Sequence, residues 1–252
     1  MDLELRGKRA IVTGGSRGIG KAIARQLALE GVDVVISARG KEQLVRTAAE
    51  LSAETGRRII PVVADTSDRA AVDGLVSATV AELGGIEILV NNAALPGGIS
   101  TATKLEQILD AEVLQDIDIK VVGYLRTARA VAPHHVAGGW GRIINIGGLA
   151  IRRTGRPVAT LRNVGVAAIT KNLADELGPK GVNVVAVHPG ATRTERTTPS
   201  AERELAAGVS IGRIVDASEV AWVVAFLASP RSVAINGDAI PIGGGSLGSI
   251  YY

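Results

Sequence analysis

The chain has 252 residues, of which 46% are hydrophobic, 21% are charged and only 2% are aromatic. Its 28 basic and 25 acidic residues give a net charge of +3, and the basic residues are scattered along the chain. This composition excludes a disordered chain, and the scarcity of aromatic side chains that could stack on bases argues against a nucleic-acid partner. We therefore expect a folded protein with a large core and a small-molecule partner.

Several other classes of protein are also disfavoured. The most apolar segment, Ala221–Leu227, is far shorter than the roughly 18 residues that a membrane span needs. The first residues lack the pattern of a secretory signal, so we expect a cytoplasmic protein. The sequence has no cysteine, and its histidines, His134, His135 and His188, are too few and badly spaced for a metal cluster. We expect no metal.

Short apolar runs bounded by glycine or acidic residues recur along the chain and alternate with helical patterns. Their near-continuous Val and Ile content indicates strands buried on both faces of a parallel sheet with right-handed crossovers. No linker or repeat divides the chain, so we predict one doubly wound α/β domain over residues 1–252, a Rossmann fold with a seven-stranded parallel sheet. The predicted strands are Ala10–Val12, Val32–Ile36, Ile59–Val63, Ile86–Val90, Arg142–Ile146, Val182–Val187 and Ala239–Ile242.

A glycine-rich turn follows the first predicted strand and opens a helical pattern, at Thr13–Gly20. Gly14 permits a tight bend, Gly18 lets the backbone approach a pyrophosphate, and Gly20 allows the helix to pack closely on the strand. Free N–H groups at the start of the helix attract the anion. This position between strand and helix predicts a nucleotide site. A polar segment from Thr192 to about Ser210 follows the sixth strand and is either a lid over the ligand or a solvated loop.

The turn is one of five motifs that occur in a characteristic order and spacing. In this order and spacing the chain resembles the short-chain dehydrogenase/reductase family over essentially its whole length. The resemblance implies a nicotinamide dinucleotide, hydride transfer to or from a carbonyl or alcohol, and a homo-oligomer, usually a tetramer. The motifs are Thr13–Gly20, Asn91-Asn-Ala-Ala94, Arg142-Ile-Ile-Asn-Ile146, His188-Pro-Gly190 and a closing Gly-Asp-Ala-Ile-Pro-Ile-Gly-Gly-Gly.

The resemblance also implies the contacts of the cofactor. Asp65 and Thr66 would hold the adenine ring, and Asn92 and Ala93 would lie beside the ribose. Ala38 stands where an NAD-specific member would place an acid. The full set of expected cofactor-binding residues is Gly14, Ser16, Arg17, Gly18, Ile19, Gly20, Arg39, Asp65, Thr66, Asn92, Ala93, Pro189 and Gly190.

The arginines in this set bear on the choice of cofactor. The guanidinium groups of Arg39 and Arg17 suit a 2′-phosphate, because each presents a forked set of donors. We therefore predict NADP over NAD. The alternative is that both are ordinary surface arginines.

The catalytic residues of the family do not carry over. Its members use a tyrosine as acid and base, a lysine four residues later, a serine that polarises the carbonyl, and an asparagine that holds a water relay. Ungapped matching places Ala159 at the tyrosine, Asn163 at the lysine and Gly148 at the serine. Lys120 falls at the asparagine, although a two-residue shift would choose Asp118. The resemblance thus implies that all four are replaced.

Protonation of an alkoxide typically contributes about 100- to 10,000-fold to such a reaction, so a substitute is needed for an active enzyme. The first candidate is Lys120 with Tyr124, an i, i+4 pair on one helical face where the ammonium would favour the phenolate. In the alternative, Lys120 reaches solvent and Tyr124 packs in the core or at a subunit contact.

A second candidate is a cluster of arginines at the expected substrate loop, Arg152, Arg153, Arg156 and Arg162. Arginine does not titrate, so these side chains would bind a carboxylate or steady an oxyanion but would not supply the proton. Together with Lys120 and Tyr124, we take Arg162 as a candidate catalytic residue. An anionic substrate would follow. The alternative is a solvated basic loop.

Two further candidates are the pair of tyrosines that end the chain and a histidine at the end of a predicted strand. Tyr251 and Tyr252 would cross into a neighbour's pocket in a tetramer, unless they form a frayed end or an interface plug. His188 precedes Pro189-Gly190 and is either an acid or a support for the backbone.

The leading interpretation is an NADP-dependent oxidoreductase with a rearranged active site, acting on a small carbonyl, alcohol or imine. The alternatives are a catalytically silent dinucleotide-binding protein and a non-redox enzyme on the same scaffold. The fold does not decide among them, because function resides in the site.

Overall fold

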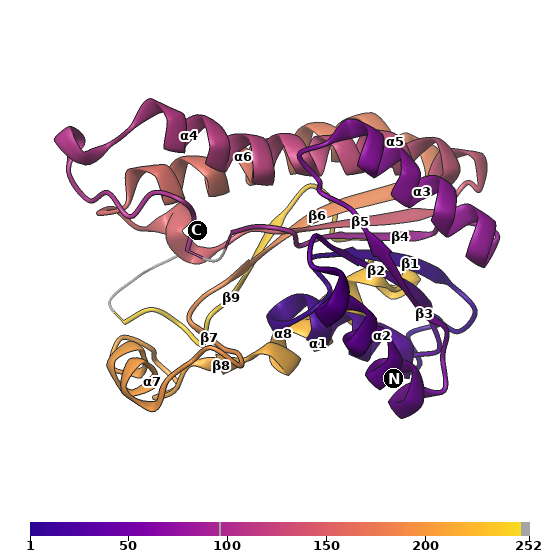
Figure 1. Ribbon diagram of the computed structural model, residues 1–252, viewed down its shortest axis with the longest axis horizontal. Coiled ribbons are helices and arrows are strands. Elements are labelled where there is room, and N and C mark those ends of the chain that lie inside the picture. The colour runs from indigo at the N-terminus through magenta and orange to yellow at the C-terminus, as the bar shows by residue number, and fades with distance from the viewer. Residues whose placement is uncertain (96, 248–252) are drawn as a thin grey trace.

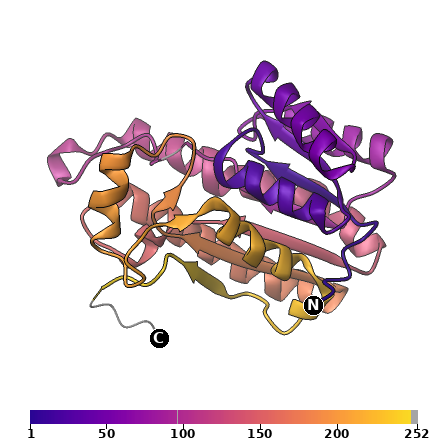
Figure 2. The same cartoon turned by 90° about the horizontal axis from the view of Figure 1, so that it is seen from below.

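The computed structural model describes residues 1–95 and 97–247. Its centre is a seven-stranded parallel sheet in the order β3-β2-β1-β4-β5-β6-β9 (Figure 1). This order confirms the predicted doubly wound Rossmann fold, and the outermost strands, β3 and β9, lie at opposite edges (Figure 2). The strands are β1 (Arg9–Thr13), β2 (Asp33–Ala38), β3 (Ile59–Val63), β4 (Ile88–Asn91), β5 (Gly141–Ile146), β6 (Val182–Pro189) and β9 (Ala239–Ile242).

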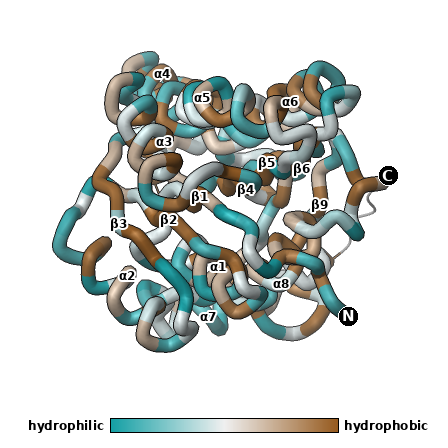
Figure 3. The backbone as a smooth tube through the Cα atoms, turned by 90° about the vertical axis from the view of Figure 1, so that its right-hand side faces the viewer, coloured by the Kyte–Doolittle hydropathy of each residue, from teal (hydrophilic) through white to brown (hydrophobic). Residues whose placement is uncertain are grey.

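Helices cover both faces of the sheet: α1, α2 and α8 lie on one side, and α3, α5 and α6 on the other (Figure 3). No helix in the described part of the chain is both long and apolar enough to cross a bilayer. The helices are α1 (Gly18–Leu29), α2 (Lys41–Thr55), α3 (Arg69–Leu83), α4 (Asp110–Ile117), α5 (Gly123–Ala137), α6 (Pro157–Leu177), α7 (Pro199–Ala206) and α8 (Ala217–Ala228).

Burial on both faces explains why the strands are almost entirely apolar. Val34 and Ile36 of β2 face the α1, α2 and α8 side, whereas Val35, between them, faces α3 and α5. All three are fully buried. Alternate side chains of one strand therefore belong to different cores, which is the arrangement that a parallel sheet covered on both sides requires.

The strand order reverses between β1 and β4, because the chain builds β1, β2 and β3 outward on one side and then returns to place β4 on the other. The crevice at the carboxyl ends of these two strands is the topological switch point, where doubly wound sheets bind ligands. The turn that contains Gly14 leaves β1 at this crevice and enters α1.

A π-helical segment, Asp118–Val122, joins α4 to α5. The sequence predicted a regular helix here, with Lys120 and Tyr124 one turn apart on a common face. The wider π turn changes the angular spacing of these two residues, so the i, i+4 rule does not apply across it. Such segments frequently occur at functional sites.

The polar segment after β6 is folded. It contains β7 (Thr192–Arg193), which pairs with β8 (Val215–Asp216), and it continues into α7. Arg193 forms ion pairs with Glu202 of α7 and with Asp216. The segment expected as a lid or loop is therefore tied to a small two-stranded sheet beside the main one.

Buried histidine is an acid-sensitive feature of this fold. His135 is fully buried near the end of α5, and neither ring nitrogen has a hydrogen-bond partner among the described residues. Burial lowers the pKa of His135 to about 4; the nearby positive charges of His134 and Arg142 act in the same direction, and Glu87 opposes them. The neutral form is thus strongly preferred in the folded state.

We predict that His135→Leu flattens the acid side of the stability curve. The folded pKa near 4 lies below the ordinary histidine pKa of 6.5, so the contribution of His135 is complete above pH 6.5 and is lost as the pH falls toward 4. The contribution of His135 to the free energy of unfolding falls by about 3 kcal/mol over that interval. Urea unfolding at several pH values measures it, with the exposed neighbour variant His134→Leu as control. The prediction would be contradicted if the free energy of unfolding changed equally with pH in the wild type and in His135→Leu.

Candidate functional site

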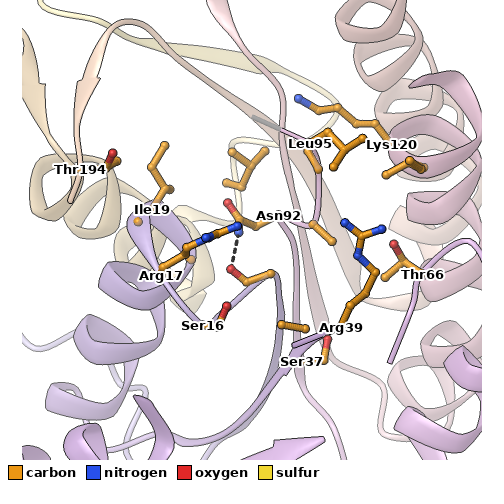
Figure 4. Close-up of a pocket in the computed structure, with 18 of the residues that line it drawn as sticks. Ser16, Arg17, Ile19, Ser37, Arg39, Thr66, Asn92, Leu95, Lys120 and Thr194 are labelled. Carbon is orange, nitrogen blue, oxygen red and sulfur yellow. Dashed lines mark hydrogen bonds between the residues drawn. The ribbon is translucent and has the colours of Figure 1, made fainter. Parts of the chain in front are cut away.

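A cleft of about 550 Å³ opens at the carboxyl ends of β1, β2, β4 and β5 (Figure 4). Its volume is in the range of small-molecule and cofactor sites. The structure brings every expected cofactor-binding residue to its lining, together with the expected catalytic residues Lys120 and Arg162. Lining residues that were not expected from the sequence include Ser37, Gln43 and Leu95, and Thr194 and Glu195 of the polar segment after β6 also line the cleft.

The glycine-rich turn leaves no room for side chains at two positions. Gly14 has a φ of +65°, and a Cβ there would lie 2.9 Å from Asn92 Nδ2. A Cβ on Gly20 would lie 2.2 Å from the Gly14 carbonyl oxygen. Asn92 Nδ2 donates to the carbonyl oxygens of Thr13 at 3.0 Å and Gly14 at 3.1 Å, and Thr13 Oγ1 accepts from the backbone N–H groups of Asn92 and Ala93. These bonds tie the ends of β1 and β4 together.

The N-terminus of α1 opens into the cleft. Arg17, at the cap position, makes no side-chain capping bond. Instead, the Gly18 N–H donates to the carboxylate of Glu195, at 3.3 Å to Oε1 and 3.1 Å to Oε2. The helix start thus attracts an anion, in this case one from the segment after β7, as the free N–H groups and helix dipole lead one to expect. An acidic residue in a polar segment after Pro189-Gly190 is the only sequence signal for this contact.

The far end of the cleft is bounded by the end of β2. Arg39 follows this strand with an exposed side chain (Figure 4), and its guanidinium lies 3.9 Å from the Asp65 carboxylate. Ser37 is fully buried, and its Oγ has no hydrogen-bond partner among the described residues. Unsatisfied buried hydroxyls are uncommon, so Ser37 is a group that a ligand could satisfy.

Lys120 of the π-helical segment is buried and lines the opposite part of the cleft. Its Nζ donates to the Gly147 carbonyl oxygen at 2.9 Å and to Asn163 Oδ1 at 3.0 Å. Burial lowers the pKa of Lys120 to about 7; the positive charge of Arg162 acts in the same direction and Asp116 opposes it. This amine can therefore exchange a proton near neutral pH, unlike an ordinary lysine.

Tyr124 does not form the expected couple with Lys120. It is 1% exposed and does not line the cleft. Its hydroxyl donates to the Ile146 carbonyl oxygen at 2.9 Å, and burial raises its pKa well above the usual value. The π turn and this hydrogen bond place the phenol in the core behind the cleft, as in the alternative considered from the sequence.

The expected cluster of arginines is dispersed. Arg162 is buried, lines the cleft and pairs with the equally buried Asp116 of α4 at 3.1 Å. Arg153 donates to Ser246 Oγ, and Arg156 donates to the Gly97 carbonyl oxygen. Arg162 alone of these three therefore combines burial with a place in the cleft, and its charge is balanced by a carboxylate.

The positions aligned with the family's catalytic residues meet beside Lys120. Asn163 and Ala159 lie one turn apart on α6, and Asn163 Nδ2 donates to the Ala159 carbonyl oxygen at 2.8 Å. Gly148 follows β5, and a Cβ there would lie 3.4 Å from Asn163 Nδ2. Tyr251 and Tyr252 lie outside the described residues.

His188 supports the backbone of the site. Its Nδ1 accepts from the Gly148 N–H at 3.0 Å, and the side chain is 2% exposed. Burial lowers its pKa to about 4, with a further contribution from the charge of Lys120. His188 is thus a neutral acceptor that fixes the loop after β5, which is one of the two roles considered for it.

Comparison with known proteins places this arrangement in a family. The sequence profile described as enoyl-(acyl carrier protein) reductase matches residues 14–246. The 3-oxoacyl-(acyl-carrier-protein) reductase FabG of Pseudomonas aeruginosa is 34% identical over 251 residues, covering 96% of this chain and 98% of the relative. The chain belongs to the short-chain dehydrogenase/reductase family. The match to this family of oxidoreductases extends over residues 14–246.

Solved structures of short-chain dehydrogenases/reductases agree with this assignment. L-sorbose reductase from Gluconobacter frateurii, complexed with NADPH and L-sorbose, superposes with a TM-score of 0.91 at 28% identity, over 99% of this chain and all of the other. The 3-ketoacyl-(acyl-carrier-protein) reductase from Brucella melitensis, complexed with NADH, gives a TM-score of 0.87 at 31% identity, over 96% of this chain and 99% of the other.

We predict that Gly147→Ala destabilises the protein by about 1–3 kcal/mol, because an added methyl group would overpack the site. The new Cβ would lie 2.2 Å from His188 Nδ1, and this ring is held by its bond to Gly148. Gly148→Ala is the matched control: its nearest contact would be at 3.4 Å, and its φ of 176° suits any residue. Urea unfolding compares the two variants with the wild type, and equal decreases in their free energies of unfolding would contradict the prediction.

Proposed function

We propose that this short-chain dehydrogenase/reductase is an NADP-dependent oxidoreductase that transfers hydride to or from a small carbonyl, alcohol or imine. The observation that carries the proposal is the cleft at the reversal between β1 and β4, where every expected cofactor-binding residue gathers around the open N-terminus of α1. A silent dinucleotide-binding protein is the alternative, since Gly148 and Ala159 offer no titratable side chain.

The residues of the cleft fit a dinucleotide. The backbone N–H groups at Gly18 and Ile19 would hold the pyrophosphate where Glu195 now lies. The unpartnered Ser37 hydroxyl and the Arg39 guanidinium would face the adenosine end. When bound, the nicotinamide ring supplies or accepts the hydride.

The preference for NADP rests on the arginines of this chain. The relatives of known structure include one complexed with NADPH and one with NADH, so they support either cofactor. Ala38 leaves no carboxylate at the end of β2, and Arg39 follows it with an exposed side chain that lines the cleft. A 2′-phosphate would give this guanidinium a stronger partner than Asp65, which lies 3.9 Å away.

We propose that Lys120, in place of Tyr124, is the general acid that protonates the substrate oxygen during reduction. The Lys120 amine lines the cleft and titrates near neutral pH, whereas the Tyr124 phenol is bonded to Ile146 in the core. Lys120 would give its proton to the substrate oxygen during reduction, while Asn163 and the Gly147 carbonyl hold Nζ in place. This arrangement replaces the tyrosine that the resemblance implies for the family.

The substrate that fits best is uncharged. Arg162 is a buried cation of the cleft, and Asp116 balances its charge at 3.1 Å. This carboxylate weakens the attraction of Arg162 for an anionic substrate, so we propose that Arg162 serves chiefly to position α4 and α6 around the cleft. We also propose a homo-oligomer, because Leu161 and Val164 on α6 and Trp222 on α8 are exposed apolar side chains.

We predict that Arg39→Asp shifts the cofactor preference from NADPH toward NADH. The substitution removes a partner for the 2′-phosphate and supplies an acceptor for a free 2′-hydroxyl. Titration calorimetry should show NADPH binding weakened by about tenfold or more, which corresponds to one charge-assisted contact. The control is Arg129→Asp, which makes the same change at an exposed position of α5. An unchanged ratio of the two dissociation constants would overturn the NADP assignment.

We predict that Lys120→Met lowers kcat for NADPH-dependent reduction by about 100-fold or more, the usual contribution of a general acid. In the wild type, kcat should fall as the pH rises through about 7, because reduction needs the protonated amine. NADPH oxidation over a panel of aldehydes, ketones and imines measures both. Tyr124→Phe should retain most of kcat. NADPH binding without turnover of any substrate would favour the silent alternative.

A further inference from the structure

The Lys120 nitrogen has one bonding direction that none of the described residues uses. Cε occupies the first tetrahedral position of Nζ, and hydrogens donated to the Gly147 carbonyl at 2.9 Å and to Asn163 Oδ1 at 3.0 Å occupy two more. The fourth position carries a third proton in the ammonium and a lone pair in the neutral amine. Figure 4 shows the side chain extending from the helix, and Lys120 lines the cleft, so a ligand bound there would lie against it.

Burial is the main reason that Nζ favours the neutral amine, and a neighbouring cation adds to this effect. Arg162 is a cation beside it, Asp116 is a carboxylate already engaged by that arginine, and His188 on the β6 side is a neutral acceptor. The pKa of about 7 that results leaves a large fraction of free base at neutral pH. Desolvated lysines next to another cation are the ones that serve as nucleophiles in proteins.

The cleft itself gives a carbonyl compound access to Lys120, which lines it together with Ile119 and Gly147. At two positions next to Asn163, the partner of Lys120, Gly148 has no side chain and Ala159 has only a methyl group. Neither residue has a hydroxyl that would bind a carbonyl oxygen and hold it away from the amine. A small carbonyl compound in the cleft can therefore meet Nζ.

We propose that Lys120 is a nucleophilic amine that forms an imine with small aldehydes and ketones. The lone pair of Nζ attacks the carbonyl carbon, a C–N bond forms, and the π pair of the carbonyl moves to oxygen. Both amine protons pass to that oxygen, the C–O bond breaks to release water, and the nitrogen lone pair forms the second C–N bond of the imine. Hydrolysis reverses the step, so it needs no oxidant or reductant. This activity goes beyond the proposed hydride transfer and does not require a bound nicotinamide.

The direct test is trapping of the imine with propanal and sodium cyanoborohydride at pH 7, without any nicotinamide nucleotide. Peptide mass mapping then compares alkylation of Lys120 with that of Lys41, an exposed lysine at the start of α2. We expect Lys120 to react about tenfold faster or more, because amines in water are protonated at pH 7. Alkylation of Lys41 with Lys120 unmodified in the folded protein would overturn the proposal.

The pH dependence of trapping distinguishes a nucleophile from a merely accessible side chain. In the wild type, alkylation of Lys120 should be half-maximal near pH 7. Asn163→Asp keeps the shape of the partner but adds a carboxylate next to Nζ, which raises the lysine pKa. Trapping at pH 7 should therefore slow severalfold in this variant and recover at higher pH, with Lys41 unaffected. The same pH profile for Lys120 and Lys41 in the wild type would overturn the proposal.

A turnover assay completes the test. Reversible imine formation exchanges the carbonyl oxygen of butanone with solvent, so the protein should accelerate incorporation of ¹⁸O from labelled water. Lys120→Met should abolish this acceleration, and its persistence in that variant would contradict the role of Lys120. These assays contain no NADPH, so a negative result would contradict imine formation but not cofactor binding or hydride transfer. A negative result in the NADPH assays would contradict hydride transfer but not imine formation.

Discussion

The N-terminus of α1 is the constraint around which the site is arranged. The first N–H groups of a helix have no partner within it, and the helix dipole adds partial positive charge at the same place. Gly14 and Gly20 bring this end against the reversal point of the sheet, where any side chain on either glycine would collide with the backbone or with Asn92. The molecule therefore presents unsatisfied donors to the cleft, and the carboxylate of Glu195 now satisfies one of them.

A second constraint acts across the cleft, where Lys120 forms no salt bridge with any described residue. It donates to Asn163 and to a carbonyl oxygen, and the carboxylate that acts on its charge, that of Asp116, is paired with Arg162. Burial without a dedicated counter-ion is what keeps its pKa near 7. The hydrogen bond from Lys120 Nζ to Asn163 Oδ1, at 3.0 Å, joins the π-helical segment to α6 at this point.

The fold was predictable because its signals are local. Runs of Val and Ile mark the strands buried on both faces, and the glycine turn marks the crossover from β1 to α1. The cofactor-binding candidates were predictable for the same reason, since they follow strand ends that a parallel sheet gathers at one edge.

The catalytic candidates were less predictable because they depend on packing between distant elements. The π turn before α5 separated Lys120 from Tyr124, and no periodicity of side chains signals such a turn. Arg162 is neutralised by Asp116, 46 residues earlier in the chain, which only the packing of α4 on α6 reveals. The contact of Glu195 with α1 likewise depends on how the segment after β7 folds back.

A crystal structure with bound NADPH is the most direct test of the nucleotide site. We expect a pyrophosphate oxygen accepting from the N–H groups at Gly18 and Ile19, with Glu195 displaced from Gly18 and the nicotinamide end beside Lys120. Glu195 still bonded to Gly18, with the nucleotide bound elsewhere or not at all, would contradict it.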